Sequence, residues 1–219
     1  MSTAATRSRF VTFEGGEGAG KTTQIKRLGE RLAAAGIVAL ATREPGGSPG
    51  AEAIRRLLVS GDTGRWEPLT EALLMVAARR DHWLQTIKPA LDRGDWVLSD
   101  RFHDSSVAYQ GRGRGVPLET LETLRRMILG DLRPDLTLIL DLPVEDGLER
   151  AHARMKGFAS GEDRFERMDS GFHERLRAGF LDIAREEPGR CVVVDARPDA
   201  DTVHATIVAA VSERLGVRL

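Results

Sequence analysis

One glycine-rich segment constrains this chain more than any other. Residues 15–22, Gly-Gly-Glu-Gly-Ala-Gly-Lys-Thr, follow the mostly apolar run Phe10–Glu14 and open a stretch of helical periodicity at Lys21. Glycines let backbone N–H groups turn inward around an anion, and a helix N-terminus adds its positive dipole end. The pattern G-x-x-x-x-G-K-[ST] between a strand and a helix predicts a phosphate-binding loop and a P-loop NTPase fold.

The rest of the chain alternates short β-rich runs with longer amphipathic stretches. The runs are nearly continuous in apolar residues, as expected when helices cover both faces of a parallel sheet. We expect strands at Phe10–Glu14, Val38–Thr42, Trp96–Asp100, Leu136–Leu142 and Cys191–Ala196. Helical periodicity predicts helices at Lys21–Ala35, Leu69–Arg93, Leu118–Leu129 and Phe165–Glu187. The alternation indicates an α/β fold: a five-stranded parallel sheet with helices on both faces, in a single domain spanning 1–219.

Two segments fit neither strand nor helix. Residues 43–50 are rich in Gly and Pro, and residues 156–164 interrupt two helical stretches. Loops of this kind lie on the surface and often close over ligands, although a plain solvent loop is the alternative. We expect the second to be part of a short lid at about 154–165.

Composition excludes several classes of protein. Lys+Arg 32 against Asp+Glu 33 gives a net charge of −1, which speaks against a general nucleic-acid partner. The single cysteine, Cys191, excludes a disulfide framework and lies in an apolar run typical of buried filler. No apolar stretch approaches the ~18 residues of a membrane span, and Met1–Arg9 lacks the apolar core of a signal peptide. We therefore expect a cytoplasmic protein with no membrane partner.

The phosphate loop predicts nucleoside triphosphate binding but no particular reaction. We expect ATP phosphates to contact Gly15, Gly16, Glu17, Gly18, Ala19, Gly20, Lys21, Thr22 and Thr23. Lys21 should reach the β- and γ-phosphates, and Thr22 should bind Mg²⁺. The chain contains no asparagine, so it lacks the Asn-Lys-x-Asp base-reading motif of GTPases. Among nucleoside triphosphate-binding proteins, the sequence is then most compatible with a small-molecule kinase. Such an enzyme needs a second cationic site for the phosphoryl acceptor and a lid that excludes water.

Asp100 and Arg101 end the third predicted strand, where an open α/β sheet presents its ligand crevice. Asp100 is suited to hold a Mg²⁺-bound water and Arg101 to clamp an acceptor phosphate, although a strand-end ion pair is the alternative. Residues 100–111 (Asp-Arg-Phe-His-Asp-Ser-Ser-Val-Ala-Tyr-Gln-Gly) resemble the signature of thymidylate kinases. The phosphate loop, residues 42–48 (Thr-Arg-Glu-Pro-Gly-Gly-Ser) and residues 77–79 (Ala-Ala-Arg) are also similar to motifs of that family. The resemblance runs in order from about residue 9 to residue 196.

The resemblance implies transfer of the γ-phosphoryl group of MgATP to dTMP, giving dTDP, in a homodimer. It implies that Glu17 accepts from the deoxyribose 3′-hydroxyl, that Arg55 and Arg101 grip the dTMP phosphate, and that Arg79 hydrogen-bonds thymine. Ser106 would lie at the thymine edge, and Tyr109 under the sugar. Further dTMP contacts are expected from Pro45, Met75, Ser105 and Gln110. Met75 departs from the family, which often has an aromatic residue there to stack on thymine.

The lid is expected to supply the arginine that stabilises phosphoryl transfer. One subclass of the family carries that arginine at the position of Gly18, and glycine has no side chain to supply it. The resemblance to the bacterial type therefore indicates a lid residue. Arg154 and Arg164 are the leading candidates, beside the catalytic Lys21 and Asp100. Asp141, at the end of another strand, is an alternative metal carboxylate.

Two other functions are compatible with parts of this pattern. A deoxynucleoside kinase would use Glu17 and the Asp100–Arg101 pair for a nucleoside hydroxyl. A nucleotide-dependent switch would hydrolyse ATP without a small-molecule acceptor. The pairing of Arg55 with Arg101 favours an acceptor that already carries a phosphate.

Overall fold

The five predicted strands form one all-parallel sheet. The computed structural model describes residues 7–155 and 162–219, with the backbone alone at 154 and 155. Its strands are β1 (Phe10–Glu14), β2 (Ala39–Arg43), β3 (Trp96–Asp100), β4 (Leu136–Asp141) and β5 (Cys191–Asp195), in the order β2-β3-β1-β4-β5. The central strand β1 pairs with β3 and β4. The predicted fold is confirmed, and each strand boundary lies within one residue of its expected position.

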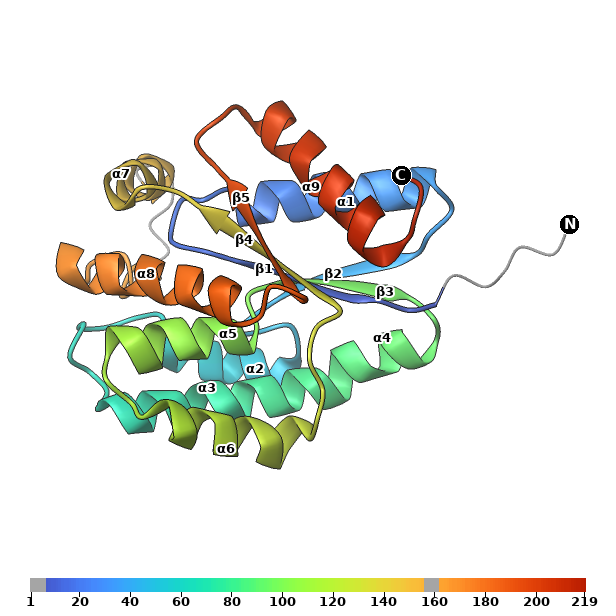
Figure 1. Ribbon diagram of the computed structural model, residues 1–219. Helices are drawn as coiled ribbons and strands as arrows, with labels where there is room; N and C mark the ends of the chain where they lie inside the picture. The colour runs from blue at the N-terminus through green and yellow to red at the C-terminus, as the bar shows by residue number, and fades with distance from the viewer. Residues whose placement is uncertain (1–6, 156–161) are drawn as a thin grey trace, which may run out of the picture.

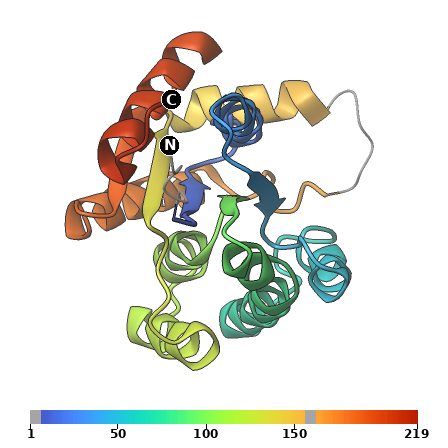
Figure 2. The same ribbon diagram turned by 90° about the vertical axis from the view of Figure 1, so that its right-hand side faces the viewer.

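Helices cover both faces of this sheet (Figures 1 and 2). They are α1 (Lys21–Ala34), α2 (Pro49–Leu58), α3 (Pro68–His82), α4 (Lys88–Asp92), α5 (His103–Ser106), α6 (Leu118–Leu129), α7 (Val144–Met155), α8 (Ser170–Glu186) and α9 (Ala200–Leu215). Two π-helical segments, η1 (Trp83–Ile87) and η2 (Val107–Gly113), join α3 to α4 and extend α5. Within the described ranges, no helix is both long and apolar enough to cross a bilayer.

Side chains of β1 alternate between the two faces of the sheet and pack against the helices on each face. Val11 and Phe13 are fully buried against α1 and α9, in a core shared with strands β3, β4 and β5. Phe10 points to the opposite layer, where its ring meets that of Phe102 edge-on at 4.8 Å between centroids. Burying both faces of a strand requires the continuous apolar run seen in the sequence.

Some helix boundaries differ from the expected ones. The single helix expected at Leu69–Arg93 is interrupted by η1, because Pro89 lacks an N–H and its ring conflicts with the carbonyl one turn earlier. The helix expected from Phe165 begins at Ser170, since the Asp169 side chain accepts from the Phe172 N–H at 2.8 Å and caps it. Residues 43–50 are only partly a loop, because α2 begins at Pro49.

A crevice opens between the carboxyl ends of β1 and β3. The chain leaves β1 through the phosphate loop toward α1 on one face, and leaves β3 toward α5 on the other (Figure 1). Neighbouring strands whose connections depart to opposite faces form the usual ligand site of an open α/β sheet. The glycine-rich loop and the Asp100–Arg101 pair therefore lie side by side.

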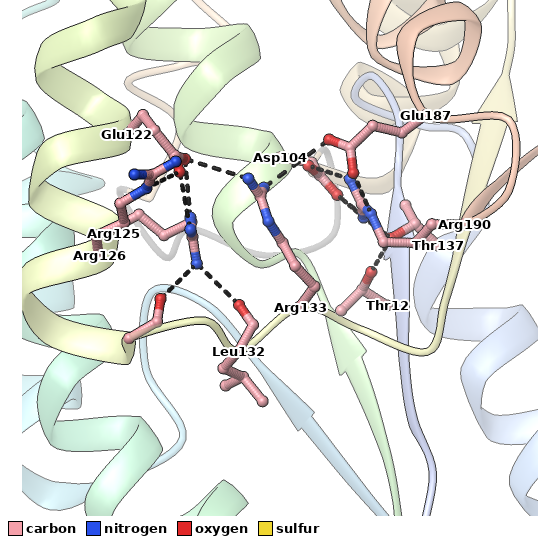
Figure 3. A network of polar contacts seen from close by, with 11 residues as sticks. Thr12, Asp104, Glu122, Arg125, Arg126, Leu132, Arg133, Thr137, Glu187 and Arg190 are labelled. Carbon is pink, nitrogen blue, oxygen red and sulfur yellow. Dashed lines mark hydrogen bonds and ion pairs between the residues drawn. The ribbon is translucent and has the colours of Figure 1, made fainter.

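A polar network holds α5 beneath the sheet (Figure 3). Arg190, just before β5, donates to both carboxylate oxygens of Asp104 at 2.7 and 3.0 Å and to the Thr137 hydroxyl at 2.6 Å. The Thr137 hydroxyl lies 2.8 Å from that of Thr12 on β1. A bidentate arginine satisfies the buried Asp104 carboxylate and ties α5 to three strands.

Candidate active site

The phosphate loop takes the backbone form that its glycines predict. Gly15, Gly18 and Gly20 all have positive φ, at 127°, 68° and 87°. At Gly18 there is also no room for a side chain, because a Cβ would collide with the Gly147 carbonyl oxygen on α7. An arginine at this position, as in one family subclass, is therefore excluded sterically as well as by sequence.

Lys21 and Thr22 start α1 at the mouth of this loop. The Lys21 ammonium donates to the carbonyl oxygens of Gly16 at 2.8 Å and Gly15 at 3.3 Å. Burial, reinforced by the nearby charge of Arg101, lowers the Lys21 pKa. The Thr22 hydroxyl donates to Asp100 Oδ2 at 2.8 Å, so the two predicted metal ligands are in contact. A cleft beside the loop, the phosphate-loop cleft, is lined by Asp100 and by seven of the nine expected ATP-contact residues, all but Gly15 and Gly16.

A second cleft adjoins the first. Its walls contain all ten residues expected to contact dTMP: Glu17, Pro45, Arg55, Met75, Arg79, Arg101, Ser105, Ser106, Tyr109 and Gln110. These residues come from the phosphate loop, the loop after β2, α2, α3, the turn after β3 and the α5–η2 segment. Arg55 and Arg101 line both clefts and therefore stand at their junction.

Arg101 is held from several sides at this junction. Its guanidinium donates to the Gly15 carbonyl oxygen at 2.9 Å, the Ser105 hydroxyl at 3.2 Å and Glu17 Oε1 at 2.9 Å. The guanidinium carbon lies 4.8 Å from the centre of the Tyr109 ring, which is a cation–π arrangement. Although burial opposes ionisation of Glu17, Arg101 and Lys21 lower its pKa to about 2. Glu17 is thus an ionised hydrogen-bond acceptor at neutral pH.

Arg79 is fixed at the other end of the second cleft. It donates to Glu44 Oε2 at 2.7 Å, the Ser106 hydroxyl at 2.9 Å and the Phe102 carbonyl oxygen at 2.9 Å. Glu44 is buried and also contacts His82 at 3.0 Å. These contacts use three of the five N–H groups, so the fixed, planar guanidinium keeps two donors for a flat ring.

Arg55 is bridged to the start of the segment after the undescribed residues. Its guanidinium donates twice to Glu162 Oε2, at 2.9 and 3.2 Å, and once to the Pro45 carbonyl oxygen at 2.9 Å. The Glu162 carboxylate therefore occupies two N–H groups of Arg55. Glu162 and a bound phosphate would therefore compete for the same guanidinium.

The structure does not bring Arg164 to the phosphates. Arg164 is fully buried and lines neither cleft. Its guanidinium donates to the carbonyl oxygens of Leu58, Asp62 and Thr63, each at 3.0 Å, and to Glu71 Oε2 at 2.5 Å. The expectation of a catalytic Arg164 therefore has no geometric support, because every nitrogen is used in packing. The Arg154 side chain and most of the expected lid lie outside the described residues.

The alternative metal carboxylate, Asp141, is also engaged elsewhere. Both of its oxygens accept from Arg177, at 2.7 and 2.8 Å, and it lines neither cleft. In the part of the chain that the structure describes, no group of three or more His, Cys, Asp or Glu side chains is arranged to hold a metal ion. The Thr22–Asp100 pair is left as the oxygen-donor site at the phosphate loop.

Sequence reasoning missed several residues of the two clefts. Glu44, Phe165 and Glu166 line the second cleft, and Glu44 holds Arg79. Glu14, the last residue of β1, is fully buried and contacts the turn that carries Arg101. The signal available for Glu14 was a carboxylate at the end of an apolar strand, because burying a charge is costly unless polar partners compensate it.

Comparison with known proteins identifies the family. The family profile described as thymidylate kinase matches residues 13–207. The thymidylate kinase of Caulobacter vibrioides is 58% identical over 212 residues, covering 97% of this chain and all of that protein. That of Nitrobacter hamburgensis is 54% identical over 209 residues, covering 95% and 90%.

A solved structure agrees with these sequences. The crystal structure of thymidylate kinase from Ehrlichia chaffeensis has a TM-score of 0.74 and 33% identity, covering 93% of this chain and 98% of that one. In the reaction of this family, ATP phosphorylates dTMP to dTDP on the route to dTTP. This reaction is the activity of the chain, which belongs to the thymidylate kinase family.

Proposed function

We propose that ATP occupies the phosphate-loop cleft and dTMP the second cleft, with their reacting phosphates meeting at Arg55 and Arg101. The observation that carries this assignment is that these two arginines line both clefts. Phosphoryl transfer needs the acceptor oxygen in line with the γ-phosphorus and cations on the developing charge. Arg55 and Arg101 supply the cations at the junction.

In this arrangement the acceptor is oriented from both ends. Arg79 and Ser106 meet the thymine edge, and Met75 packs beside the ring. Glu17 accepts from the 3′-hydroxyl while Tyr109 closes the space under the sugar. The acceptor phosphate is already ionised near pH 7, so a phosphate oxygen attacks the γ-phosphorus without a general base. Catalysis then rests on positioning and on charge stabilisation by Lys21 and the arginines.

Mg²⁺ is the proposed cofactor, held by Thr22 and Asp100. A hydroxyl and a carboxylate 2.8 Å apart supply hard oxygen donors, and Mg²⁺ commonly takes one or two protein oxygens and completes its shell with phosphates and water. When bound, the ion would neutralise charge on the transferring phosphates. Asp100→Asn should raise the Mg²⁺ concentration needed for half-maximal rate, whereas the KM for dTMP should change little.

Arg154 is the proposed catalytic arginine of the lid at about 154–165. Gly18 has no space for a side chain and Arg164 is fully engaged in packing, which leaves Arg154 of the two leading candidates. An arginine on the transferring phosphoryl group contributes ~10³–10⁵ in rate. Arg154→Ala should therefore lower kcat by about 10³ or more, with little change in thermal stability.

We also propose a homodimer, a single domain over 1–219 and a cytoplasmic location. Leu69 and Leu73, one turn apart on α3, are 41% and 48% exposed, and Leu57 on the adjacent α2 is 40% exposed. Exposed leucines on packed helices are typical of an interface. Sedimentation should give twice the chain mass, and Leu73→Glu should give the monomer. Cell fractionation tests the location.

The central assignment is tested with Arg101→Ala, using Arg177→Ala as a control that removes the same charge from a residue lining neither cleft. Loss of a charge-assisted phosphate contact at a buried site is expected to cost about 3 kcal/mol. The kcat/KM for dTMP should fall roughly 100-fold in Arg101→Ala and stay within about threefold in Arg177→Ala. Equal losses in the two variants would contradict the assignment.

A further inference from the structure

The turn that carries Arg101 is conformationally costly and has to be held in place. Arg101 has φ of 73°, and it is the non-glycine residue with positive φ in the described part of the chain. A non-glycine residue in this region is strained and persists only where its surroundings hold it there. The Arg101 N–H donates to the Phe13 carbonyl oxygen at 2.9 Å, which ties one side of the turn to β1.

Glu14 holds the other side of this turn. Its carboxylate accepts from the Phe102 N–H at 2.7 Å, directly after the strained residue. The second oxygen accepts from the Ser105 hydroxyl at 2.6 Å. That hydroxyl in turn accepts from the Arg101 guanidinium at 3.2 Å. The contacts form a chain from a buried carboxylate to the guanidinium at the junction of the two clefts.

A neighbouring carboxylate shows that this arrangement is not simple charge pairing. Asp104, also buried, is neutralised by the bidentate Arg190 (Figure 3). Glu14 accepts instead from two neutral donors among the described residues. Its burial, with the nearby charge of Asp104, raises the pKa of Glu14 to about 7. A buried carboxylate kept without a direct cationic partner costs stability, which indicates a role other than packing.

We propose that Glu14 is a positioning residue of the acceptor site, holding Arg101 through Ser105 and the Phe102 backbone in the orientation that receives the phosphate of dTMP. The inference rests on the proposed binding of that phosphate by Arg101. Glu14 does not touch the substrate, and its effect is confined to the phosphate end of the cleft. Glu44 has the corresponding place at the base end, because it holds Arg79 at 2.7 Å.

Thymidine and dTMP differ only in the phosphate. Comparing their Kd values therefore distinguishes an effect at the phosphate end of the cleft from an effect at the base end. Glu14→Gln keeps an oxygen for the Phe102 N–H, but its amide donates to Ser105, so the Ser105 O–H loses the acceptor that fixes its orientation toward Arg101. We expect the Kd for dTMP, measured by calorimetry, to rise about tenfold, the effect of one charge-assisted hydrogen bond. The Kd for thymidine should change less than twofold. Glu44→Gln is the matched control and should weaken both ligands by similar factors.

Ser105→Ala provides a second variant that leaves the buried carboxylate in place. It should show the same selective loss for dTMP, and the double variant with Glu14→Gln should lose no more than either alone, because the two residues act in one chain. Equal weakening of dTMP and thymidine in Glu14→Gln would make Glu14 a structural residue and overturn the inference. If the wild-type protein binds dTMP no more tightly than thymidine, the assignment of Arg101 fails first, and the inference fails with it.

Discussion

Replacing Arg164 with alanine tests whether this residue is a structural anchor or a catalyst. The side chain is fully buried, and its four hydrogen bonds join the segment that begins at residue 162 to the α2–α3 connection and to Glu71. Breaking a buried pair by removing one partner costs about 3–5 kcal/mol, because the remaining charge is uncompensated. Glu71 keeps contacts with Arg114 and Gln110, which places the expected loss near the lower end of that range.

The assay is urea unfolding of Arg164→Ala beside Arg167→Ala, a matched control whose side chain is 44% exposed. We expect a loss of about 3 kcal/mol for Arg164→Ala and less than about 1 kcal/mol for Arg167→Ala. In a chain of this length the first value corresponds to a fall in Tm of about 6–12 °C. At a temperature where both variants are folded, kcat should stay within about tenfold of wild type. Unchanged stability with kcat reduced 10³-fold would refute the structural role and restore Arg164 as the lid catalyst.

Three further predictions concern the loop and the acceptor cleft. Burial raises the pKa of Glu14 from the ordinary 4.5 to about 7, so between these pH values the folded state holds a proton that the unfolded state has released. The contribution of Glu14 to the free energy of unfolding is therefore fully present below pH 4.5 and is lost as the pH rises through 7. Relative to Glu14→Gln, wild type should lose about 3 kcal/mol across this window in pH-dependent urea unfolding, and a flat difference would contradict the shift. Gly18→Ala should raise the KM for ATP more than tenfold, since φ is 68° and a Cβ meets Gly147; an unchanged KM would show that the loop relaxes freely. Glu162→Gln should tighten dTMP binding up to about fivefold in calorimetry by releasing Arg55 from a partly exposed pair, and weaker binding would show that Glu162 assists the substrate.

Sequence periodicity was sufficient for the sheet because strands buried on both faces leave an unmistakable apolar run. Phe10–Glu14 and Trp96–Asp100 are correct to the residue. The failures came where a local rule competed with the period. Pro89 interrupts the Leu69–Arg93 helix through η1, and the Asp169 cap starts α8 five residues later than the apolar pattern suggests.

The site residues also differ in how far the sequence predicts them. Residues inside contiguous motifs, such as Lys21, Arg101 and Tyr109, line the clefts as expected, because the motif carries both their identity and their neighbours. Glu14 and Glu44 also lie in or beside these motifs, but the sequence does not indicate their roles, because their partners lie on other elements, 88 and 35 positions away. Long-range contacts between buried polar groups leave no periodic trace in a single sequence.

The central claim is tested most directly by mixing the purified chain with ATP, Mg²⁺ and one acceptor at a time, and following ADP and the phosphorylated product. We expect rapid formation of dTDP from dTMP, slower reaction with dUMP and no reaction with thymidine. ADP production without a phosphorylated acceptor, or turnover of thymidine itself, would contradict the account of a site that requires an acceptor phosphate at Arg55 and Arg101.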